Sequence, residues 1–182
     1  MLRKGIQTGI LLITICFTFL PLEGLSQVGY VWGSVMPSPT YGDAGLDAEC
    51  DNKGNIFSCG DYKDNATIGG TLYPSFGSTD VYVSKQDAHG QYEWVTVKGS
   101  PTTDRQFAVS LGPADHSYTT GYGLIIFPFN RTALHQWDAL TIRYRPNGNV
   151  AWGRAMDGDV YSEGRDIAVD QDGNSYTVGF LK

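Results

Sequence analysis

The sequence predicts an all-β fold built from β-propeller blades of four antiparallel strands, and three observations predict it. First, the 182 residues include 23 glycines and 11 tyrosines, and no long stretch shows the helical periodicity of apolar residues. Second, one turn sequence occurs twice, 119 residues apart, with a more divergent copy between the two. Third, the repeating unit of about 60 residues divides into four short strands, although the last unit lacks its fourth strand. Tandem four-stranded units are typical of propeller blades.

The N-terminus has the pattern of a secretory signal peptide. Arg3 and Lys4 precede the apolar run Ile10–Leu20, and small residues occupy the positions before Gln27. We expect cleavage after Ser26, which divides the chain into a signal peptide, 1–26, and a repeat region, 27–182. The alternative is an uncleaved anchor, although the apolar run is shorter than the roughly 20 residues that span a bilayer. The mature chain is therefore expected outside the cytoplasm without a membrane span, in the periplasm, at the cell surface or secreted.

The first repeated element is a strand, a tight turn and a second strand. It occupies Cys50–Gly60 and again Val169–Gly179. In both copies two residues separate Asp from Gly-Asn. After one further residue come an aromatic residue and a hydroxyl residue, and a Gly closes the segment two residues later. Gly accepts the positive φ that such turns require, and Asp and Asn bond their own backbone, so this pattern predicts a hairpin.

The middle copy aligns through Gly121, which lies 61 residues after Gly60 and 58 before Gly179. In this alignment Ala48, Val109 and Ile167 share one position. Two residues later, Cys50, Leu111 and Val169 share another. Apolar residues at a spacing of two describe one face of a strand. In the middle copy the segment 112–116 replaces the Asp-Gly-Asn turn with different residues of similar turn chemistry.

A second repeated element is a strand that begins with Asp and ends with a basic residue, followed by a Gly turn and a Trp-led strand. It occurs at Asp80–Trp94 and at Asp138–Trp152, and Trp32 leads the first unit. The predicted units are 32–93, 94–151 and a partial 152–182. The repeat positions are Trp32, Asp51, Gly54, Asn55, Gly60, Asp80, Gly90, Trp94, Gly121, Asp138, Gly148, Trp152, Asp170, Gly173, Asn174 and Gly179.

These repeat positions resemble those of the bacterial β-propeller repeat family whose name refers to seven blades (SBBP). The resemblance covers Trp32 to Lys182 and is weakest in the middle unit, which lacks equivalents of Asp51 and Gly54. It implies an exported or surface-exposed bacterial protein and no defined activity. About two and a half units are present, fewer than the four to eight blades of a closed ring. We therefore expect the chain to be an N-terminal fragment of a longer protein, or else further blades to come from other copies.

Several residues raise alternatives to a purely structural role. Asp170, Asp172 and Asn174 resemble part of a calcium loop. Lys53 replaces Asp172 in the first copy and would repel a cation, so turn chemistry is the favoured interpretation and no cofactor is predicted. Cys50 and Cys59 occupy positions held by Val in the last copy. This favours buried free thiols over a disulfide. The repeated Trp could form a sugar-stacking platform, but packing between blades explains them better.

The sequence predicts a binding scaffold for a protein or a glycan, with function carried by loops on a rigid frame. No catalytic residues are identified and no binding residues can be named. Two alternatives remain: an enzyme, a hydrolase or lyase with its site in the central channel of a full ring, and a structural component of the cell surface or of adhesion. A net charge of −6 without a basic patch argues against nucleic acid as a partner.

Overall fold

The computed structural model describes residues 11–12, 34–35, 42–124, 137–156 and 160–182. The predicted all-β fold is confirmed, because antiparallel strands account for the regular structure. The only helical element in those segments is the short 3-10 turn Pro113–Asp115. Among the described residues, no helix is long and apolar enough to cross a membrane. Trp32 and most of the predicted signal peptide lie outside the described residues.

The strands form two four-stranded meanders and three two-stranded pairs. The first meander has the order β3-β4-β7-β8. In the sequence the hairpin β5-β6 lies between β4 and β7, but it forms a sheet of its own. The second has the order β9-β10-β11-β12, and it is followed by the pair β13-β14. The bounds are β1 Leu11–Leu12, β2 Ser34–Val35, β3 Ala44–Cys50, β4 Ile56–Tyr62, β5 Ala66–Ile68, β6 Thr71–Tyr73, β7 Asp80–Gln86, β8 Tyr92–Lys98, β9 Arg105–Leu111, β10 Ser117–Tyr122, β11 Ala139–Tyr144, β12 Val150–Met156, β13 Ser162–Val169 and β14 Ser175–Leu181.

Each sheet begins one strand later than the unit described from the sequence. The strands that carry Trp94 and Trp152, β8 and β12, pair with the Asp-led strands that precede them, β7 and β11. The spacing of equivalent residues predicts the length of the repeat, about 60 residues. It does not predict which four strands form one sheet, because a repeat can be counted from any of its strands.

The repeated glycine of β4, β10 and β14 has one physical cause in all three copies. A Cβ built on Gly60 would lie 2.0 Å from the backbone oxygen of Ala44, and on Gly121 it would lie 1.8 Å from that of Arg105. On Gly179 the distance to the backbone oxygen of Glu163 would be 1.9 Å. Beside each glycine the neighbouring strand carries a β-bulge. The bulge brings the two backbones too close for any side chain.

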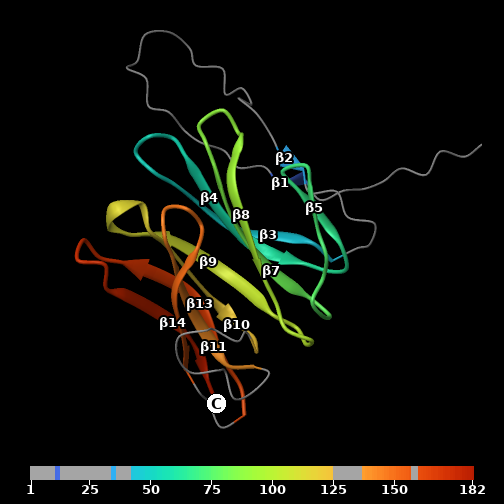
Figure 1. The fold of residues 1–182 in the computed structure, drawn as a ribbon. Coiled ribbons are helices and arrows are strands. Elements are labelled where there is room, and N and C mark those ends of the chain that lie inside the picture. The colour runs from blue at the N-terminus through green and yellow to red at the C-terminus, as the bar shows by residue number, and fades with distance from the viewer. Residues whose placement is uncertain (1–10, 13–33, 36–41, 125–136, 157–159) are drawn as a thin grey trace, which may run out of the picture.

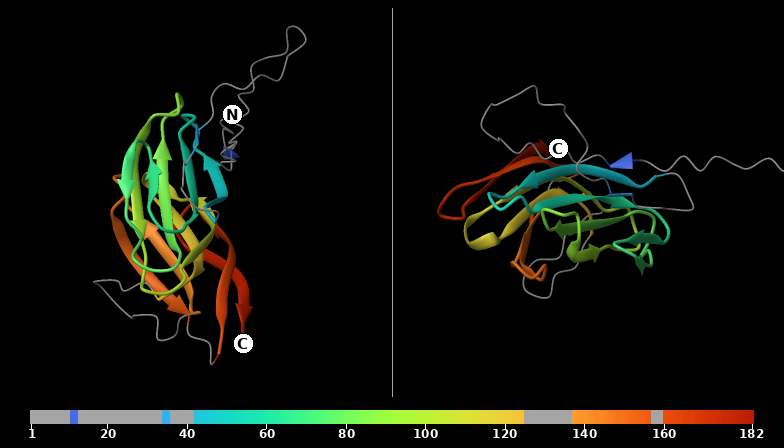
Figure 2. Two further views of the ribbon diagram at one scale, coloured as in Figure 1. Left: turned by 90° about the vertical axis from the view of Figure 1, so that its right-hand side faces the viewer. Right: turned by 90° about the horizontal axis from the view of Figure 1, so that it is seen from above.

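The two four-stranded sheets and the β13-β14 pair, which we call the third sheet, are stacked as successive layers. The second sheet lies between the first and the third (Figures 1 and 2). Apolar side chains of both four-stranded sheets form the largest core: Phe57, Cys59, Val81, Val83, Val109, Leu140, Ile142 and Tyr144. A smaller core joins the second sheet to the third: Ala108, Tyr118 and Ile167, with Trp152 and Val169. The hairpin β5-β6 packs on the remaining face of the first sheet and forms a third cluster: Tyr62, Ala66, Ile68 and Tyr82.

Cys50 corrects one prediction. Cys59 is buried as expected, and neither cysteine forms a disulfide, but Cys50 is exposed rather than buried. Its equivalents Leu111 and Val169 pack against the sheet that precedes theirs. In the described part of the chain no four-stranded sheet precedes the first one to cover this position, so Cys50 of β3 is exposed.

Candidate functional site

The turn between β3 and β4 is held by the side chain of Asp51. Its Oδ1 accepts hydrogen bonds from the backbone N–H groups of Lys53 (2.8 Å) and Asn55 (2.9 Å), and its Oδ2 accepts one from Asn55 Nδ2 (2.7 Å). The Asp51 N–H donates to the Asn55 carbonyl at 2.9 Å, and Gly54 has a φ of 81°. Gly is needed at this position because that φ is costly for residues with a Cβ.

The turn between β13 and β14 repeats this geometry. Asp170 Oδ1 accepts from the N–H groups of Asp172 (3.0 Å) and Asn174 (2.8 Å), and its Oδ2 accepts from Asn174 Nδ2 (2.8 Å) and the Tyr176 hydroxyl (3.0 Å). Gly173 has a φ of 83°. Both carboxylate oxygens of Asp170 thus serve the turn, which supports turn chemistry over a calcium loop. Within the described residues no group of three or more His, Cys, Asp or Glu is arranged to hold a metal ion.

The middle copy closes its turn without a glycine at the left-handed position. The Gly112 N–H donates to the His116 carbonyl at 2.8 Å, which matches the outer bond of the other two turns. Inside, Ala114 and Asp115 have φ values of 56° and 57°. Asp115 occupies the position of Gly54 and Gly173 in the alignment, so this turn keeps the left-handed backbone at a residue that pays strain for it.

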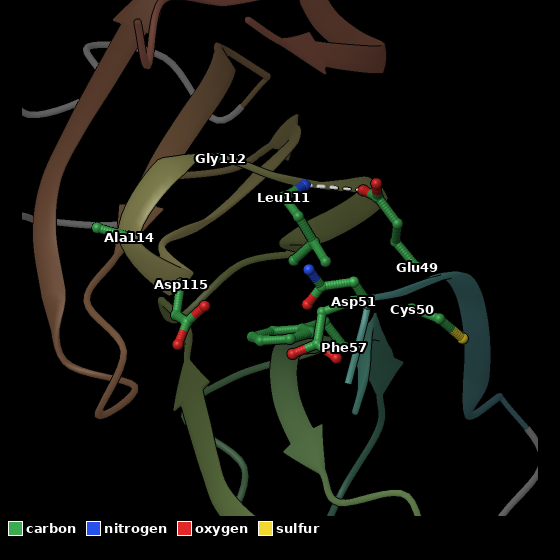
Figure 3. A pocket seen from close by; sticks show the side chains of 9 residues that line it. Glu49, Cys50, Asp51, Phe57, Leu111, Gly112, Ala114 and Asp115 are labelled. Carbon is green, nitrogen blue, oxygen red and sulfur yellow. Dashed lines mark hydrogen bonds between the residues drawn. The ribbon is translucent and has the colours of Figure 1, made fainter. Parts of the chain in front are cut away.

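A pocket of about 320 Å³ lies between the β3-β4 turn and the β9-β10 turn. Figure 3 shows its walls, and we call it the inter-turn pocket. Phe57 and Leu111 supply apolar surface, and Glu49, Asp51 and Asp115 supply three carboxylates. The other residues that line it are Cys50, Asn52, Gly112 and Ala114. The Cys50 thiol is directed away from the other labelled side chains (Figure 3).

Two of the pocket carboxylates have pKa values that are shifted in opposite directions. Burial raises the pKa of Glu49, assisted by the charge of Asp47 and opposed by the hydrogen bond that Glu49 Oε2 accepts from Leu111 N at 2.7 Å. Burial also acts to raise the pKa of Asp51, but the hydrogen bonds from Asn55 and Lys53 together outweigh it and lower that pKa. Glu49 therefore takes up a proton at a higher pH than Asp51 does.

Among the ion pairs of the described residues, the pair between Lys53 and Asp115 connects these two turns. Lys53 Nζ lies 3.1 Å from Asp115 Oδ2, so the pair links the turn of the first sheet to the turn of the second. The two side chains are 63% and 46% exposed. Such exposed pairs contribute little to stability. Three carboxylates line the inter-turn pocket, and the two ammonium groups near it, those of Lys53 and Lys85, are each paired with a carboxylate, so the pocket is acidic.

At the opposite end of the inner strands, charged and aromatic side chains tie the sheets together. Arg105 of β9 forms an ion pair with the buried Asp61 of β4. Burial raises the pKa of Asp61 despite this arginine, and the bond to Asp61 raises the pKa of Arg105. Arg165 of β13 pairs with Glu163 and lies 4.5 Å from the centre of the Phe107 ring. These contacts join successive sheets, so we assign them to packing.

The repeated tryptophans also lie in the packing. Trp94 meets the Phe57 ring edge-on at 6.1 Å and donates from Nε1 to the Pro146 carbonyl of the second sheet at 2.9 Å. Trp152 meets the Tyr118 ring in the same way at 6.0 Å. This arrangement supports packing between sheets over a sugar platform for these two residues. Trp32 lies outside the described residues.

Sequence reasoning missed a repeated contact in which an Asp carboxylate accepts a hydrogen bond from the backbone N–H of a residue 20 positions later. Asp43 Oδ1 accepts from the Lys63 N–H at 2.9 Å, and Asp104 Oδ1 accepts from the Leu124 N–H at 2.9 Å. Asp43 and Asp104 lie 61 residues apart, the spacing that relates Gly60 to Gly121, and this was the available signal. Two other carboxylates, Asp47 and Glu49, accept from backbone N–H groups of β9, which no sequence pattern indicated.

Comparison with protein-family models and with curated proteins finds no match to the chain. The resemblance to the bacterial propeller repeat family therefore remains a prediction from the repeat positions.

Proposed function

We propose that the chain is an exported β-propeller repeat protein that acts as a binding scaffold, and that its inter-turn pocket receives a basic side chain of a protein partner. The propeller is supported by successive four-stranded sheets with the same order, the same bulge and the same stacking. Closure of the ring and export of the chain are part of this proposal.

The observation that carries the binding role is the chemistry of the inter-turn pocket. The partly exposed Leu111, with the buried Phe57 behind it, suits the alkyl stem of a lysine or arginine, and the carboxylates at the rim suit its charge. The volume of about 320 Å³ is at the lower end of the range for ligand pockets, which fits one long side chain better than a large molecule. The frame around the pocket is fixed by repeated turns, so the site is rigid.

The test uses three probes on the protein: a hexalysine peptide, a hexaglutamate peptide and the neutral oligosaccharide maltohexaose. We expect hexalysine alone to shift the backbone amide signals of Leu111, Gly112 and Asp115 in a saturable titration followed by NMR. Glu49→Gln should weaken that titration more than Asp64→Asn does. Asp64 is exposed beyond the far end of β4, so the second variant is a control for the same loss of charge.

Two results would contradict the proposal. If hexalysine shifts amides over the whole surface and both variants weaken it equally, the attraction is a general effect of net charge. If maltohexaose shifts the pocket amides and hexalysine does not, the scaffold binds a glycan instead.

A further inference from the structure

The carboxylates of the inter-turn pocket are already partly used by the protein itself. Both oxygens of Asp51 accept hydrogen bonds within the β3-β4 turn. Glu49 Oε2 accepts a hydrogen bond from the Leu111 N–H at 2.7 Å. Asp115 Oδ2 lies 3.1 Å from Lys53 Nζ. Each of the three carboxylates therefore has at least one oxygen engaged before a ligand binds.

This use of the oxygens discriminates between the two basic side chains. The guanidinium of arginine is a planar fork, and its strongest pairing takes both oxygens of one carboxylate. The ammonium of lysine is compact and carries three donors on a flexible stem, so it can bind single oxygens of separate carboxylates. The pocket offers the second arrangement. Glu49 lies near the end of β3, and Asp115 lies in the β9-β10 turn on the other side of Leu111 (Figure 3).

The equivalent place between the second and third sheets shows which kind of group fits there. Tyr118 occupies the position of Phe57, and its hydroxyl donates to the Gly173 carbonyl at 3.2 Å. Gly173 in turn occupies the position of Asp115. Between the second and third sheets this place is thus filled by one compact donor. Phe57 has no hydroxyl, and the inter-turn pocket lies beside its ring.

We propose that the inter-turn pocket selects the ammonium of a lysine over the guanidinium of an arginine, and that this ammonium takes the place that the Tyr118 hydroxyl takes between the second and third sheets. Phe57 is then a specificity-determining residue, because a hydroxyl on its ring would occupy the place of the ammonium. Lys53 is a precedent within the chain, since its ammonium pairs with one oxygen of Asp115. This inference rests on the proposed function and names the side chain that the pocket receives.

The test compares hexalysine with hexaarginine at equal ionic strength, in titrations followed by NMR at the backbone amides of Leu111 and Asp115. We expect hexalysine to bind more tightly by a factor of about two to five, the range for one exposed ion pair. Attraction by net charge alone predicts equal binding or the opposite order, because a guanidinium is the better partner for carboxylates at interfaces.

The variant Phe57→Tyr should weaken the binding of hexalysine and remove the preference over hexaarginine. The fold should tolerate this change, since Tyr118 occupies the equivalent position, and unchanged amide signals of β11 and β12 check this. Phe76→Tyr is the matched control. Phe76 is 55% exposed and precedes β7, whose first residue Asp80 pairs with Tyr62 at the end of β4 away from the pocket. This control should bind both peptides as the unaltered protein does.

Three results would overturn the proposal. If hexaarginine binds at these amides as tightly as hexalysine, the selection is wrong while the proposed function stands. If Phe57→Tyr binds hexalysine as the unaltered protein does, the ammonium does not take the place of the hydroxyl, and the basis for the selection is lost. If neither peptide shifts these amides, the proposed function itself is wrong, and the selection is wrong with it.

Discussion

At the scale of single residues, the inter-turn pocket is acidic because three carboxylates line it and the neighbouring cations Lys53 and Lys85 are each paired with a carboxylate. We predict that Lys53→Ala increases affinity for hexalysine by a factor of about two to five, the range expected from removing one exposed charge near the site. Stability should not change measurably, because the Lys53–Asp115 pair is exposed. The titration is measured by NMR, with chemical denaturation for stability.

Lys63→Ala is the control for this prediction. Lys63 is exposed just beyond the far end of β4, so its loss changes the net charge equally without touching the pocket. An equal gain in affinity for both variants would show that the net charge of the protein, and not the pocket, governs binding.

Glu49 should make this binding sensitive to pH. Its pKa is raised by burial, so it is protonated as the pH falls towards the ordinary value of 4.5, while the lowered pKa of Asp51 keeps that carboxylate charged. We predict that hexalysine binding weakens as the pH falls through this window. In Glu49→Gln the weakening in this window should disappear, since Gln keeps an oxygen for the Leu111 N–H and does not titrate.

The sign for stability is the opposite of the sign for binding. Because the folded state holds the Glu49 proton more tightly than the unfolded state does, Glu49 contributes more stability below the raised pKa and loses it as the pH rises.

A Glu49→Gln protein whose hexalysine binding kept the same dependence on pH would show that another group is responsible for the pH dependence of binding.

At the scale of elements, the bulged hairpin explains why glycine recurs. We predict that Gly121→Ala lowers the free energy of unfolding by about 3 kcal/mol, because the new Cβ would lie 1.8 Å from the Arg105 carbonyl oxygen and the bulge cannot open without losing its pairing. Gly70→Ala is the comparison. Gly70 has a φ of 79° and open space around its Cβ position, so only backbone strain of about 1 kcal/mol is expected. Urea denaturation measures both, and equal losses would contradict the role given to the bulge.

The elements also show where sequence reasoning succeeds and stops. Turn residues and alternating apolar residues are local, so the hairpin at Asp51–Asn55 and the shared positions of Ala48, Val109 and Ile167 could be predicted. The partner of a Trp-led strand is not local, and neither is the cover over Cys50, because both depend on which sheet lies next to which. The hairpin β5-β6 was not predicted from the sequence, because its short strands carry no repeated pattern.

The pocket could not be predicted for a related reason. Its walls come from two turns about 60 residues apart in the chain, and the packing of β3 against β9 brings them together. Asp51 was identified, but as a turn residue. Glu49 and Asp115 were not, because a carboxylate at the end of a strand has no meaning until the neighbouring sheet is placed.

At the scale of the whole molecule, stability should be graded along the stack. In a repeat architecture each sheet is stabilised mainly by its neighbours. The first two sheets share the largest core, in which Leu140 and Ile142 are fully buried, whereas β13-β14 packs through one face and exposes the other. We predict that the amides of β13-β14 exchange fastest by local opening, and that those of β4, β7, β10 and β11 exchange only on global unfolding.

Two core substitutions test whether the first two sheets and the β13-β14 pair unfold separately. Ile142→Ala removes a side chain from the core between the first and second sheets, and it should lower the free energy of global unfolding by about 2–5 kcal/mol and speed exchange in both sheets. Ile167→Ala lies in the smaller core of β13, so it should speed exchange in β13-β14 while leaving β4 and β7 nearly unchanged. Mass-spectrometric hydrogen exchange resolves the strands. If Ile167→Ala speeds hydrogen exchange equally in all three sheets, the sheets unfold as a single unit. The third repeat would then stabilise the other two as much as they stabilise it.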